Sequence, residues 1–396
     1  MKKAFIMKAL RTPIGSFGGK LSALSATDLG GLAIKAVVQQ SRIPSEKVEH
    51  VYMGNVLSAN LGQAPARQAA LAGGLPVETE ATTLNKVCSS GIKAITLAAT
   101  SLMAGKASVV VVAGGMESMS NVPFYLPQNR FTAQKLGHPV MVDGLLKDGL
   151  WDVYHDYHMG NAAEHNVRLH QISRQEQDNY TVASYQKAIT STENKVYSPE
   201  IITVEVGDAK GTRTLVDLDE DVFKVKFDKI PLLQPVFEPG GTITAANASN
   251  LNDGAAAVLL AAEEALDAFP SEPMAEILDF EDASQAQELF CTSPAVAIRR
   301  LLDRNGLKVS DISFFEINEA YASVVLANAK LLRIPLEKIN PFGGAVALGH
   351  PIGASGARIV VTLLNVLKQR KGELGIAAIC NGGGGSTAVL VKNLQA

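Results

Sequence analysis

Two kinds of apolar segment alternate along the chain. Short, almost continuous apolar runs, typical of strands buried on both faces, occur at residues 4–7, 109–113, 312–315 and 376–379. Longer segments with small or apolar residues on one face predict helices at residues 29–40, 91–104 and 354–367. Asp28 is expected to cap the first helix, and Gly105 is expected to end the second. Helices that alternate with buried strands predict a layered α/β protein.

The two halves of the chain share one order of elements. In the first half, C-S-S-G at 88–91 opens a helix that leads to a strand ending in G-G at 114–115. In the second half, A-S-G-A at 354–357 opens a helix that leads to a strand ending in C-N-G-G at 380–383. The distance from the Ser-Gly pair to the double glycine is 23 residues (114 − 91) in one half and 26 (382 − 356) in the other. This recurrence favours a duplicated domain over chance.

The middle of the chain differs from both halves. Residues 121–241 carry most of the tyrosines and histidines, and residues 204–237 are charged and irregular. This pattern indicates an elaborated insertion rather than a part of the core.

Composition narrows the class of protein. With 47% hydrophobic and 19% charged residues, the chain is typical of a globular protein, and its 396 residues suffice for two or three domains. The net charge of −3 is not the basic excess of a nucleic-acid-binding protein. No apolar run approaches the roughly 20 residues of a membrane span. We therefore expect neither a nucleic-acid partner nor a membrane association.

Three cysteines, Cys88, Cys291 and Cys380, lie far apart and form no C-x-x-C pair. That spacing argues against a zinc site and against a disulfide framework. An odd number of cysteines fits a reducing compartment, so we expect a cytoplasmic protein with at least one reactive thiol.

Cys88 lies at the expected start of a helix, in the motif N-K-V-C-S-S-G at 85–91. Unpaired backbone N–H groups and the helix dipole stabilise a thiolate there, which would lower the pKa of Cys88 and make it a nucleophile at neutral pH. The alternative is a small cysteine buried at a tight packing point, and position alone does not decide between the two.

Two further motifs carry residues suited to acid–base chemistry. His350 precedes Pro351 in G-H-P-I-G-A-S-G at 349–356, a stiff loop that suits a general base, although a loop histidine bonded to a carbonyl is the alternative. Cys380 begins C-N-G-G-G-G at a strand end. The glycine N–H groups suit an oxyanion hole, and a flexible tight turn is the alternative. The run lacks the lysine of a P-loop.

A fourth motif, E-I-N-E-A-Y at 316–321, follows an apolar run. Asn318 is a candidate to hold a water or a carbonyl oxygen, and Glu319 is a candidate to orient a base. An asparagine helix cap beside an exposed glutamate is the commoner case.

Four side chains of metal-ligand types lie within seven residues, at Asp152, His155, Asp156 and His158. Their spacing matches no helix ligand pattern such as H-E-x-x-H. The aromatic residues among them favour a binding wall, so we expect no metal at this place.

Together these motifs make the chain resemble the thiolase family, most closely its short-chain acetyl-CoA acetyltransferase branch. The resemblance covers essentially the whole chain. Its motifs are R-T-P-I-G-S-F at 11–17, V-C-S-S-G at 87–91, G-G-M-E-S-M-S at 114–120, H-M-G at 158–160, A-N-A-S at 246–249, L-N-D-G-A at 251–255, N-E-A-Y at 318–321, G-H-P-I-G-A-S-G-A-R at 349–358 and C-N-G-G-G-G at 380–385. Each motif alone is moderately specific, whereas all of them in this order are very specific.

The resemblance implies an acetyl-CoA C-acetyltransferase, which condenses two acetyl-CoA into acetoacetyl-CoA and CoA or runs the reverse thiolysis. It implies that Cys88 carries the acyl group, that His350 activates it, and that Cys380 moves a proton at the acetyl α-carbon or the CoA thiol. Asn318 would hold a water that forms one oxyanion hole with His350. The N–H groups of Cys88 and Gly382 would form the other hole. An acyl-cysteine intermediate implies ping-pong kinetics.

The resemblance also implies the fold and the assembly. The expected fold is a duplicated βαβαβαββ unit in five α-β-α-β-α layers with an inserted loop domain. The expected parts are an N-terminal domain at residues 1–120 with 245–268, a CoA-covering and tetramer-forming loop domain at 121–244, and a C-terminal domain at 269–396. Arg130 and Lys135 fall in the stretch that pairs dimers, so we expect a homotetramer built as a dimer of dimers.

Eight residues are expected by resemblance to contact CoA or the acyl group, with CoA a substrate rather than a cofactor. They are His158 and Met159 along the pantetheine, Ser249 at its amide, Phe237 near the adenine, Lys224 where the family often has an arginine near the nucleotide, Phe290 and Tyr321 at the acyl pocket, and Ala246.

The chain departs from the family pattern at two places. Tyr321 replaces the usual phenylalanine, and its hydroxyl needs a partner if it is buried. The animal mitochondrial member binds potassium through backbone carbonyls and a tyrosine hydroxyl. The carbonyl positions are present here, at Ala245, Ala246, Ala248 and Val346. The tyrosine position holds Val222 or Phe223, which argues against potassium activation, so we expect no cofactor.

Three alternatives share this resemblance. A degradative 3-ketoacyl-CoA thiolase would accept longer chains, depending on the pocket around Met159, Phe290 and Tyr321. A ketoacyl synthase would lack a second catalytic cysteine, so Cys380 argues against it. A non-catalytic CoA- or lipid-binding relative would have lost Cys88 or Cys380, and both are present.

Overall fold

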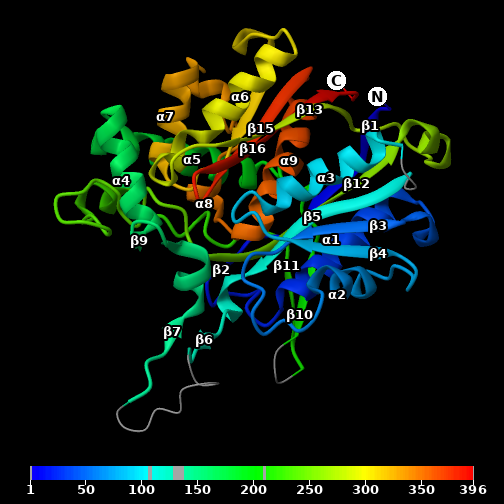
Figure 1. The fold of residues 1–396 in the computed structure, drawn as a ribbon, viewed down its shortest axis with the longest axis horizontal. Helices are drawn as coiled ribbons and strands as arrows, with labels where there is room; N and C mark the ends of the chain where they lie inside the picture. Colours follow the sequence, from blue (N-terminus) through cyan, green and yellow to red (C-terminus); the bar gives the residue numbers. More distant parts are fainter. Residues whose placement is uncertain (1, 106–108, 128–137, 208–210, 396) are drawn as a thin grey trace.

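A single mixed sheet forms the frame of the molecule in the computed structural model, which describes residues 2–105, 109–127, 138–207 and 211–395 (Figure 1). Its ten strands are β1 (Ala4–Arg11), β2 (Gly15–Ser16), β3 (His50–Gly54), β4 (Glu80–Leu84), β5 (Val110–Ser118), β12 (Asn252–Ala262), β13 (Ala275–Ser284), β14 (Phe314–Ile317), β15 (Leu374–Asn381) and β16 (Gly385–Asn393). Their order is β14-β15-β16-β13-β1-β12-β5-β3-β4, with β2 paired to β12. The short antiparallel pairing of β1 with β13 joins two halves of the sheet.

The two halves have the same topology. Numbered along the chain, the strands of the N-terminal half lie in the order 3-2-4-5-1, as β4-β3-β5-β12-β1. The C-terminal half repeats this order as β14-β15-β16-β13, with an isolated parallel bridge from Phe315 to Ile339 where the third strand would lie. This repetition confirms the duplication predicted from the sequence.

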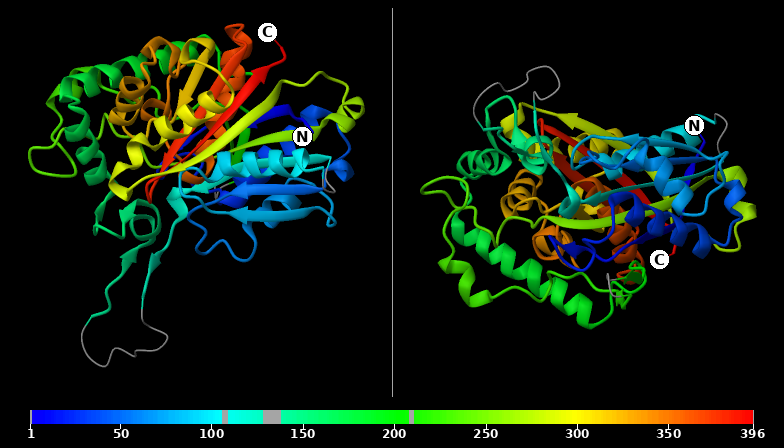
Figure 2. Two further views of the ribbon diagram at one scale, coloured as in Figure 1. Left: turned by 45° about the horizontal axis from the view of Figure 1, so that its top comes forward. Right: turned by 90° about the horizontal axis from the view of Figure 1, so that it is seen from below.

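Six helices pack on the sheet in three layers, namely α1 (Ala26–Ser41), α2 (Pro65–Ala72), α3 (Ser90–Met103), α6 (Ser293–Arg304), α7 (Ala322–Leu332) and α9 (Ile352–Gln369). The other helices of the described residues are α4 (Met159–His170), α5 (Arg174–Glu193) and α8 (Ala345–Leu348). Helices α1 and α2 bury their apolar faces on the outer side of the N-terminal half, and α6 and α7 do so on the C-terminal half. Helices α3 and α9 lie between the two halves of the sheet (Figure 2). One apolar cluster there contains residues of both halves. The predicted five layers are therefore present.

Burial explains the composition of the central layer. Every residue of α9 from Ile352 to Leu367 is buried, so most residues on all faces of this helix are apolar or small. Helix α1, on the outer layer, instead has exposed polar residues along one side.

The segment between β5 and β12 leaves the sheet and returns as the neighbouring strand. It contains α4, α5 and three two-stranded ribbons, β6 (Phe124–Tyr125) with β7 (Val142–Asp143), β8 (Trp151–Asp152) with β9 (Tyr157–His158), and β10 (Val204–Gly207) with β11 (Arg213–Val216). The buried guanidinium of Arg11 fastens it to the core by bonding Glu200 at 2.6 Å and Asp219 at 2.7 Å. The bounds of the three domains stay a prediction, and Arg130 and Lys135 lie outside the described residues.

Two local expectations differ from the structure. The cap of α1 is Ser25, whose hydroxyl accepts the N–H of Asp28, while the Asp28 carboxylate bonds back to Ser25 in a capping box. The predicted irregular stretch begins with the ribbon of β10 and β11. Gly105 does follow the end of α3, in the left-handed conformation expected of a helix stop.

Candidate active site

Cys88 lies in a tight turn directly before α3. The turn is closed by backbone bonds from Ser89 N–H to the carbonyl of Lys86 (3.1 Å) and from Ser90 N–H to that of Val87 (3.0 Å). Val87 has a φ of 48°, which is rare for a β-branched residue. Strain of this kind persists only where the surroundings impose it, and it is common at functional sites.

Close packing of α3 on α9 brings the two halves of the site together. A Cβ on Gly91 would lie 2.7 Å from the backbone nitrogen of Ala357, and one on Gly356 would lie 2.5 Å from that of Ile92. Both glycines therefore permit direct backbone contact between the helices. Cys88 precedes α3 and His350 precedes α9, so this contact places both residues at one end of the central layer.

The imidazole of His350 is held by its neighbours. Its backbone N–H donates to Oδ1 of Asn252 at 3.0 Å, and its Nδ1 lies 2.6 Å from Oγ of Ser355. Nε2 has no hydrogen-bond partner among the described residues. Burial, with the positive charge of Arg358 in second place, lowers the pKa of His350 to about 3. His350 is thus a neutral imidazole at physiological pH.

The glycine loop after β15 meets the cysteine turn. Gly383 and Gly384 have φ angles of 84° and 85°, so the backbone turns where a side chain would be strained. Burial raises the pKa of Cys88 to about 12, and the N–H groups of Gly382 and of Cys88 itself act in the opposite direction. The expectation of a lowered pKa was therefore wrong, because burial outweighs the helix start. A base must take the proton from Cys88.

All three cysteines gather at this end of the fold as free thiols. Burial, followed by the nearby Cys88, raises the pKa of Cys380 far above its ordinary value. Burial, followed by the nearby Cys380, does the same for the pKa of Cys291. Cys380 is 1% exposed and lies in the apolar cluster behind the cavity wall.

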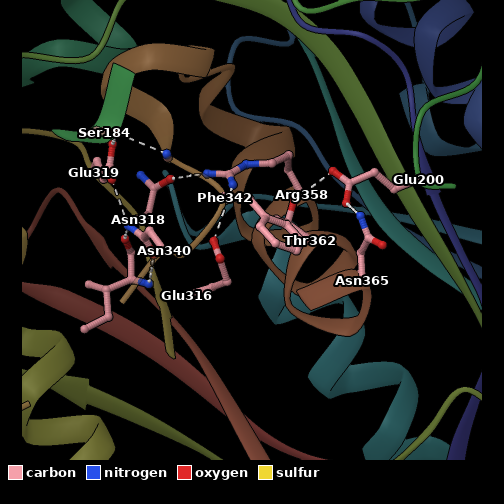
Figure 3. Close-up of polar contacts among 12 residues, drawn as sticks. Ser184, Glu200, Glu316, Asn318, Glu319, Asn340, Phe342, Arg358, Thr362 and Asn365 are labelled. Carbon is pink, nitrogen blue, oxygen red and sulfur yellow. Dashed lines mark hydrogen bonds and ion pairs between the residues drawn. The ribbon is translucent and has the colours of Figure 1, made fainter. Parts of the chain in front are cut away.

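Asn318 lies beside His350 rather than at a helix cap, because α7 begins only at Ala322. Its N–H donates to the carbonyl of Ala378 at 3.0 Å, and its Nδ2 is 3.5 Å from Nδ1 of His350. The next residue, Glu319, does not orient the base. It is buried and accepts hydrogen bonds from four neighbours, Tyr180, Ser184, Asn340 and the N–H of Val346. Figure 3 shows Glu319 with Ser184 and Asn340.

A cavity of about 440 Å³ opens onto this cluster. Nine of the residues expected from the sequence line it, namely Cys88, His158, Met159, Phe237, Ser249, Phe290, Tyr321, His350 and Gly382. Ala246 and Lys224 line a smaller neighbouring cavity of about 290 Å³, and Asn250 lines both. Cys380 and Asn318 do not line either of them and lie buried beneath the surface.

One wall of the large cavity is an aromatic stack. The rings of His158 and Phe237 are 4.7 Å apart and nearly parallel, and Phe237 covers Gly160 at the start of α4. His158 Nδ1 accepts the N–H of Gly160 at 3.0 Å. In the loop before β12, the hydroxyl of Ser249 donates to the carbonyl of Ala320 at 3.0 Å, which leaves its lone pairs available to a ligand N–H.

Three residues that hold the site were missed by sequence reasoning. Ser355 and Asn252 fix His350, and the buried carboxylate of Glu117 accepts the N–H of Gly353 at 2.9 Å and that of Val56 at 3.1 Å. Burial raises the pKa of Glu117 to about 7. All three residues belong to the family motifs given above. Each is a polar residue within a motif of mostly small and apolar residues, and that contrast was the signal in the sequence.

The Asp and His side chains near residue 155 make hydrogen bonds within the chain. Asp152 Oδ1 accepts the N–H groups of Tyr154 and His155, and Asp156 accepts the indole N–H of Trp151 at 2.9 Å. Across the described ranges, no three His, Cys, Asp or Glu side chains are placed to hold a metal ion. None of the helices in the described part of the chain is long and apolar enough to cross a membrane.

Known proteins match this chain over nearly its full length. The family models for the thiolase N-terminal and C-terminal domains match residues 4–264 and 271–393. The chain is 49% identical to acetyl-CoA acetyltransferase 1 of Arabidopsis thaliana, over 98% of this chain and 93% of that protein. It is also 49% identical to acetyl-CoA acetyltransferase B, mitochondrial, of Xenopus laevis, over 100% of this chain and 93% of that protein. The crystal structure of the Acat5 thiolase from Ascaris suum in complex with coenzyme A aligns with a TM-score of 0.93 and 42% identity, over 99% of this chain and all of that one. The chain therefore belongs to the thiolase family.

Proposed function

We propose that this protein is an acetyl-CoA C-acetyltransferase, which catalyses the reversible condensation of two acetyl-CoA into acetoacetyl-CoA and CoA. One observation carries the proposal. A thiol, an unpartnered imidazole nitrogen and a glycine N–H, from Cys88, His350 and Gly382, face one cavity, and a second thiol lies behind it. Acyl transfer through a cysteine needs these groups.

In the first half of the reaction, Nε2 of His350 takes the proton of Cys88. The sulfur attacks the thioester carbonyl of acetyl-CoA, and the C–S bond to CoA breaks. The imidazolium returns its proton to the leaving CoA thiolate, so the products are acetyl-Cys88 and CoA. The N–H groups of Cys88 and Gly382 stabilise the oxyanion that forms in between.

In the second half, the Cys380 thiol gives its proton to the imidazole of His350, and the resulting thiolate removes a proton from the methyl group of a second acetyl-CoA. The enolate oxygen is stabilised by the His350 imidazolium and by a water held on Asn318. The α-carbon attacks acetyl-Cys88, and the C–S bond breaks to give acetoacetyl-CoA and the Cys88 thiolate, which takes back a proton from His350. The reverse sequence is thiolysis by CoA.

The proposed CoA site follows the cavity outward from the cysteines. His158, Met159 and Ser249 contact the pantetheine, and Phe237 packs near the adenine end. Burial lowers the pKa of His158, so its ring is neutral and suited to packing against the apolar chain. Lys224, which lines the neighbouring cavity, supplies a positive charge for the nucleotide phosphates.

The acyl pocket between Met159, Phe290 and Tyr321 supports a short-chain substrate. Phe290 is 3% exposed and Tyr321 is 7% exposed, so both rings are fixed in the apolar cluster behind the cavity. A broader degradative 3-ketoacyl-CoA thiolase is the second candidate, because the same residues line a cavity of about 440 Å³.

We propose no cofactor. Ala245 and Ala246 line the smaller cavity together with Lys224, whose ammonium lies 3.2 Å from Asp221. Val222 is buried and Phe223 is 52% exposed, and neither carries an oxygen in its side chain. A potassium ion does not fit these residues, because a lysine already supplies the positive charge. A homotetramer in the cytoplasm completes the proposal.

The test is CoA-dependent loss of the absorbance of acetoacetyl-CoA, repeated with 3-ketodecanoyl-CoA. Cleavage of the short substrate alone supports the acetyltransferase. Comparable cleavage of both selects the broader thiolase. A folded protein that cleaves neither refutes the proposal in favour of a non-catalytic CoA-binding relative.

A further inference from the structure

Arg358 approaches the active site from α9 without lining the cavity. Its side chain is 3% exposed, Nη2 lies 3.4 Å from Oδ1 of Asn318, and Nη1 lies 3.7 Å from Oε2 of Glu316 (Figure 3). Glu316 is in β14 and Asn318 directly follows it. Arg358 therefore joins the central helix to the strand end that carries Asn318.

The contact with Arg358 decides which way the Asn318 amide faces. A guanidinium donates hydrogen bonds and accepts none, so the Asn318 atom next to it is the carbonyl oxygen. The amide nitrogen then lies on the other side, 3.5 Å from Nδ1 of His350. At that distance the amide is a neighbour of the imidazole rather than a strong bond partner. The amide N–H groups of Asn318 therefore lie on the side of the imidazole.

The charge of Arg358 also acts on His350. The Asn318 amide lies between the two groups, 3.4 Å from the guanidinium and 3.5 Å from the imidazole. After burial, Arg358 is the second cause of the lowered pKa of His350. The other titratable side chains that line the cavity with His350 are Cys88, Asp143, His158 and Tyr321. Glu316 offsets the charge of Arg358 only in part. The separation of 3.7 Å is longer than a hydrogen bond, and neither Glu316 oxygen has a hydrogen-bond partner in the described part of the chain.

The surroundings of Glu316 weaken it as a counter-ion. Burial raises the pKa of Glu316 to about 8 despite the attraction of Arg358. The nearby Glu319 and Glu200 raise it further, and Lys187 opposes them. A carboxyl that is partly protonated near neutral pH leaves most of the guanidinium charge to act on the imidazole.

From this geometry we propose that Arg358 is a positioning residue, whose guanidinium orients the Asn318 amide toward the active site and whose charge keeps His350 neutral as a base. The inference rests on the proposed function for its consequence in turnover, but its electrostatic part concerns the folded protein alone.

The experiment uses the full chain with three variants. Arg358→Lys keeps the charge but not the planar fork. Arg358→Met alone would leave the buried carboxylate of Glu316 without its partner, which could prevent folding. The double variant Arg358→Met with Glu316→Gln removes both charges and avoids this. Thr362→Val is the matched control, because Thr362 lies one turn further along α9 and bonds Glu200 at 3.0 Å instead of Asn318.

The first readout is the NMR titration of the His350 ring, assigned by its loss in His350→Gln. We expect the pKa of His350 to rise by about one unit or more in the double variant, and to stay low in Arg358→Lys and Thr362→Val. The second readout is steady-state thiolysis of acetoacetyl-CoA. We expect kcat to fall about tenfold in Arg358→Lys and about a hundredfold in the double variant, with the KM for CoA within about threefold.

Two results overturn the inference. A His350 pKa in the double variant equal to that of Thr362→Val removes the electrostatic role. A kcat within about threefold of that control removes the positioning role, whatever the titration shows. A wild-type protein that does not cleave acetoacetyl-CoA refutes the proposed function instead, and the titration then still decides the effect of Arg358 because it needs no substrate.

Discussion

The Nδ1 atom of His350 lies 2.6 Å from the hydroxyl oxygen of Ser355, and that hydroxyl lies 2.8 Å from the carbonyl oxygen of Pro351. A carbonyl oxygen can only accept, so the Ser355 hydroxyl donates to it and accepts a hydrogen bond from the N–H group at Nδ1. The imidazole is thereby held as the tautomer with a bare Nε2, and Nε2 is the nitrogen without a partner in the described structure. Ser355 thus determines which nitrogen can act as the base.

Replacing Ser355 with alanine should lower kcat by roughly ten- to hundredfold, because the imidazole loses its fixed tautomer and orientation. The KM for CoA should change little, since Ser355 does not line the cavity. Steady-state thiolysis measures both constants. Ser323→Ala is the control, because Ser323 is also buried in a helix but its hydroxyl has no partner among the described residues. Equal kcat values for the two variants would contradict the role of Ser355.

Variants of the two proposed catalytic cysteines should block different steps of the reaction. Cys88→Ala should form no acetyl-enzyme from acetyl-CoA, whereas Cys380→Ser should acetylate and then fail to turn over, because a hydroxyl is a poor base at the α-carbon. Mass spectrometry of the intact protein detects the acetyl group, and the thiolysis assay measures turnover. Cys291→Ala is the control and should keep most of the activity. Near-normal turnover of Cys380→Ser would show that the acid–base assignment is wrong.

Local sequence patterns were sufficient to find residues that the fold brings together, but not to predict their pKa values. Cys88, His350 and Cys380 each stand in a short motif whose residue types suit the chemistry. The pKa of Cys88 was predicted with the wrong sign, because a helix start is a local feature whereas burial depends on segments far along the chain. The role of Glu319 was also missed, since its partners on α5 lie 135 residues or more before it.

The fold was predictable for a related reason. The duplication was visible because the helix–strand–glycine order recurs, and α3 and α9 indeed occupy equivalent places in the central layer. The third strand of the C-terminal half is reduced to the bridge at Ile339. The pattern of hydrophobic residues along the chain does not reveal that this strand is shortened. The close approach of Gly91 to Ala357 and of Gly356 to Ile92 explains the recurrence, since each repeat needs a glycine where the two helices touch.

Gly160→Ala should weaken CoA binding with little effect on the chemical step. A Cβ at this position would meet the ring of Phe237 at 2.3 Å, so the ring must move away from His158. We expect the KM for CoA to rise by about tenfold and kcat to change by less than about threefold, which is typical of lost uniform binding. Gly207→Ala is the control, because a Cβ there meets no atom of the described residues within 4 Å. An unchanged KM would remove Phe237 from the proposed CoA site.

Tyr321→Phe tests the departure from the family pattern. The hydroxyl of Tyr321 has no hydrogen-bond partner in the described ranges, although the ring is buried beside Phe237 and lines the cavity. Removing the hydroxyl makes the pocket more apolar, so the ratio of kcat/KM for 3-ketodecanoyl-CoA over acetoacetyl-CoA should rise by about threefold or more. Stability should not fall by more than about 0.5 kcal/mol, because no hydrogen bond is lost. A lower ratio would show that the hydroxyl does not select against longer chains.

The low pKa of His350 should also appear in the pH dependence of stability. The pKa of His350 falls from 6.5 in the unfolded chain to about 3 in the folded protein. Below pH 6.5 the unfolded chain therefore binds a proton that the folded protein does not. The stabilising contribution is complete above pH 6.5 and is lost as the pH falls toward 3, at roughly 1.4 kcal/mol per pH unit. Glu117 and Glu316, whose pKa values are raised, act with the opposite sign. The informative quantity is therefore the difference between wild type and His350→Gln, measured by urea unfolding at several pH values. As the pH falls, the unfolding free energy of His350→Gln should increase relative to that of the wild type. A difference that does not change with pH would mean that His350 keeps an ordinary pKa in the folded protein.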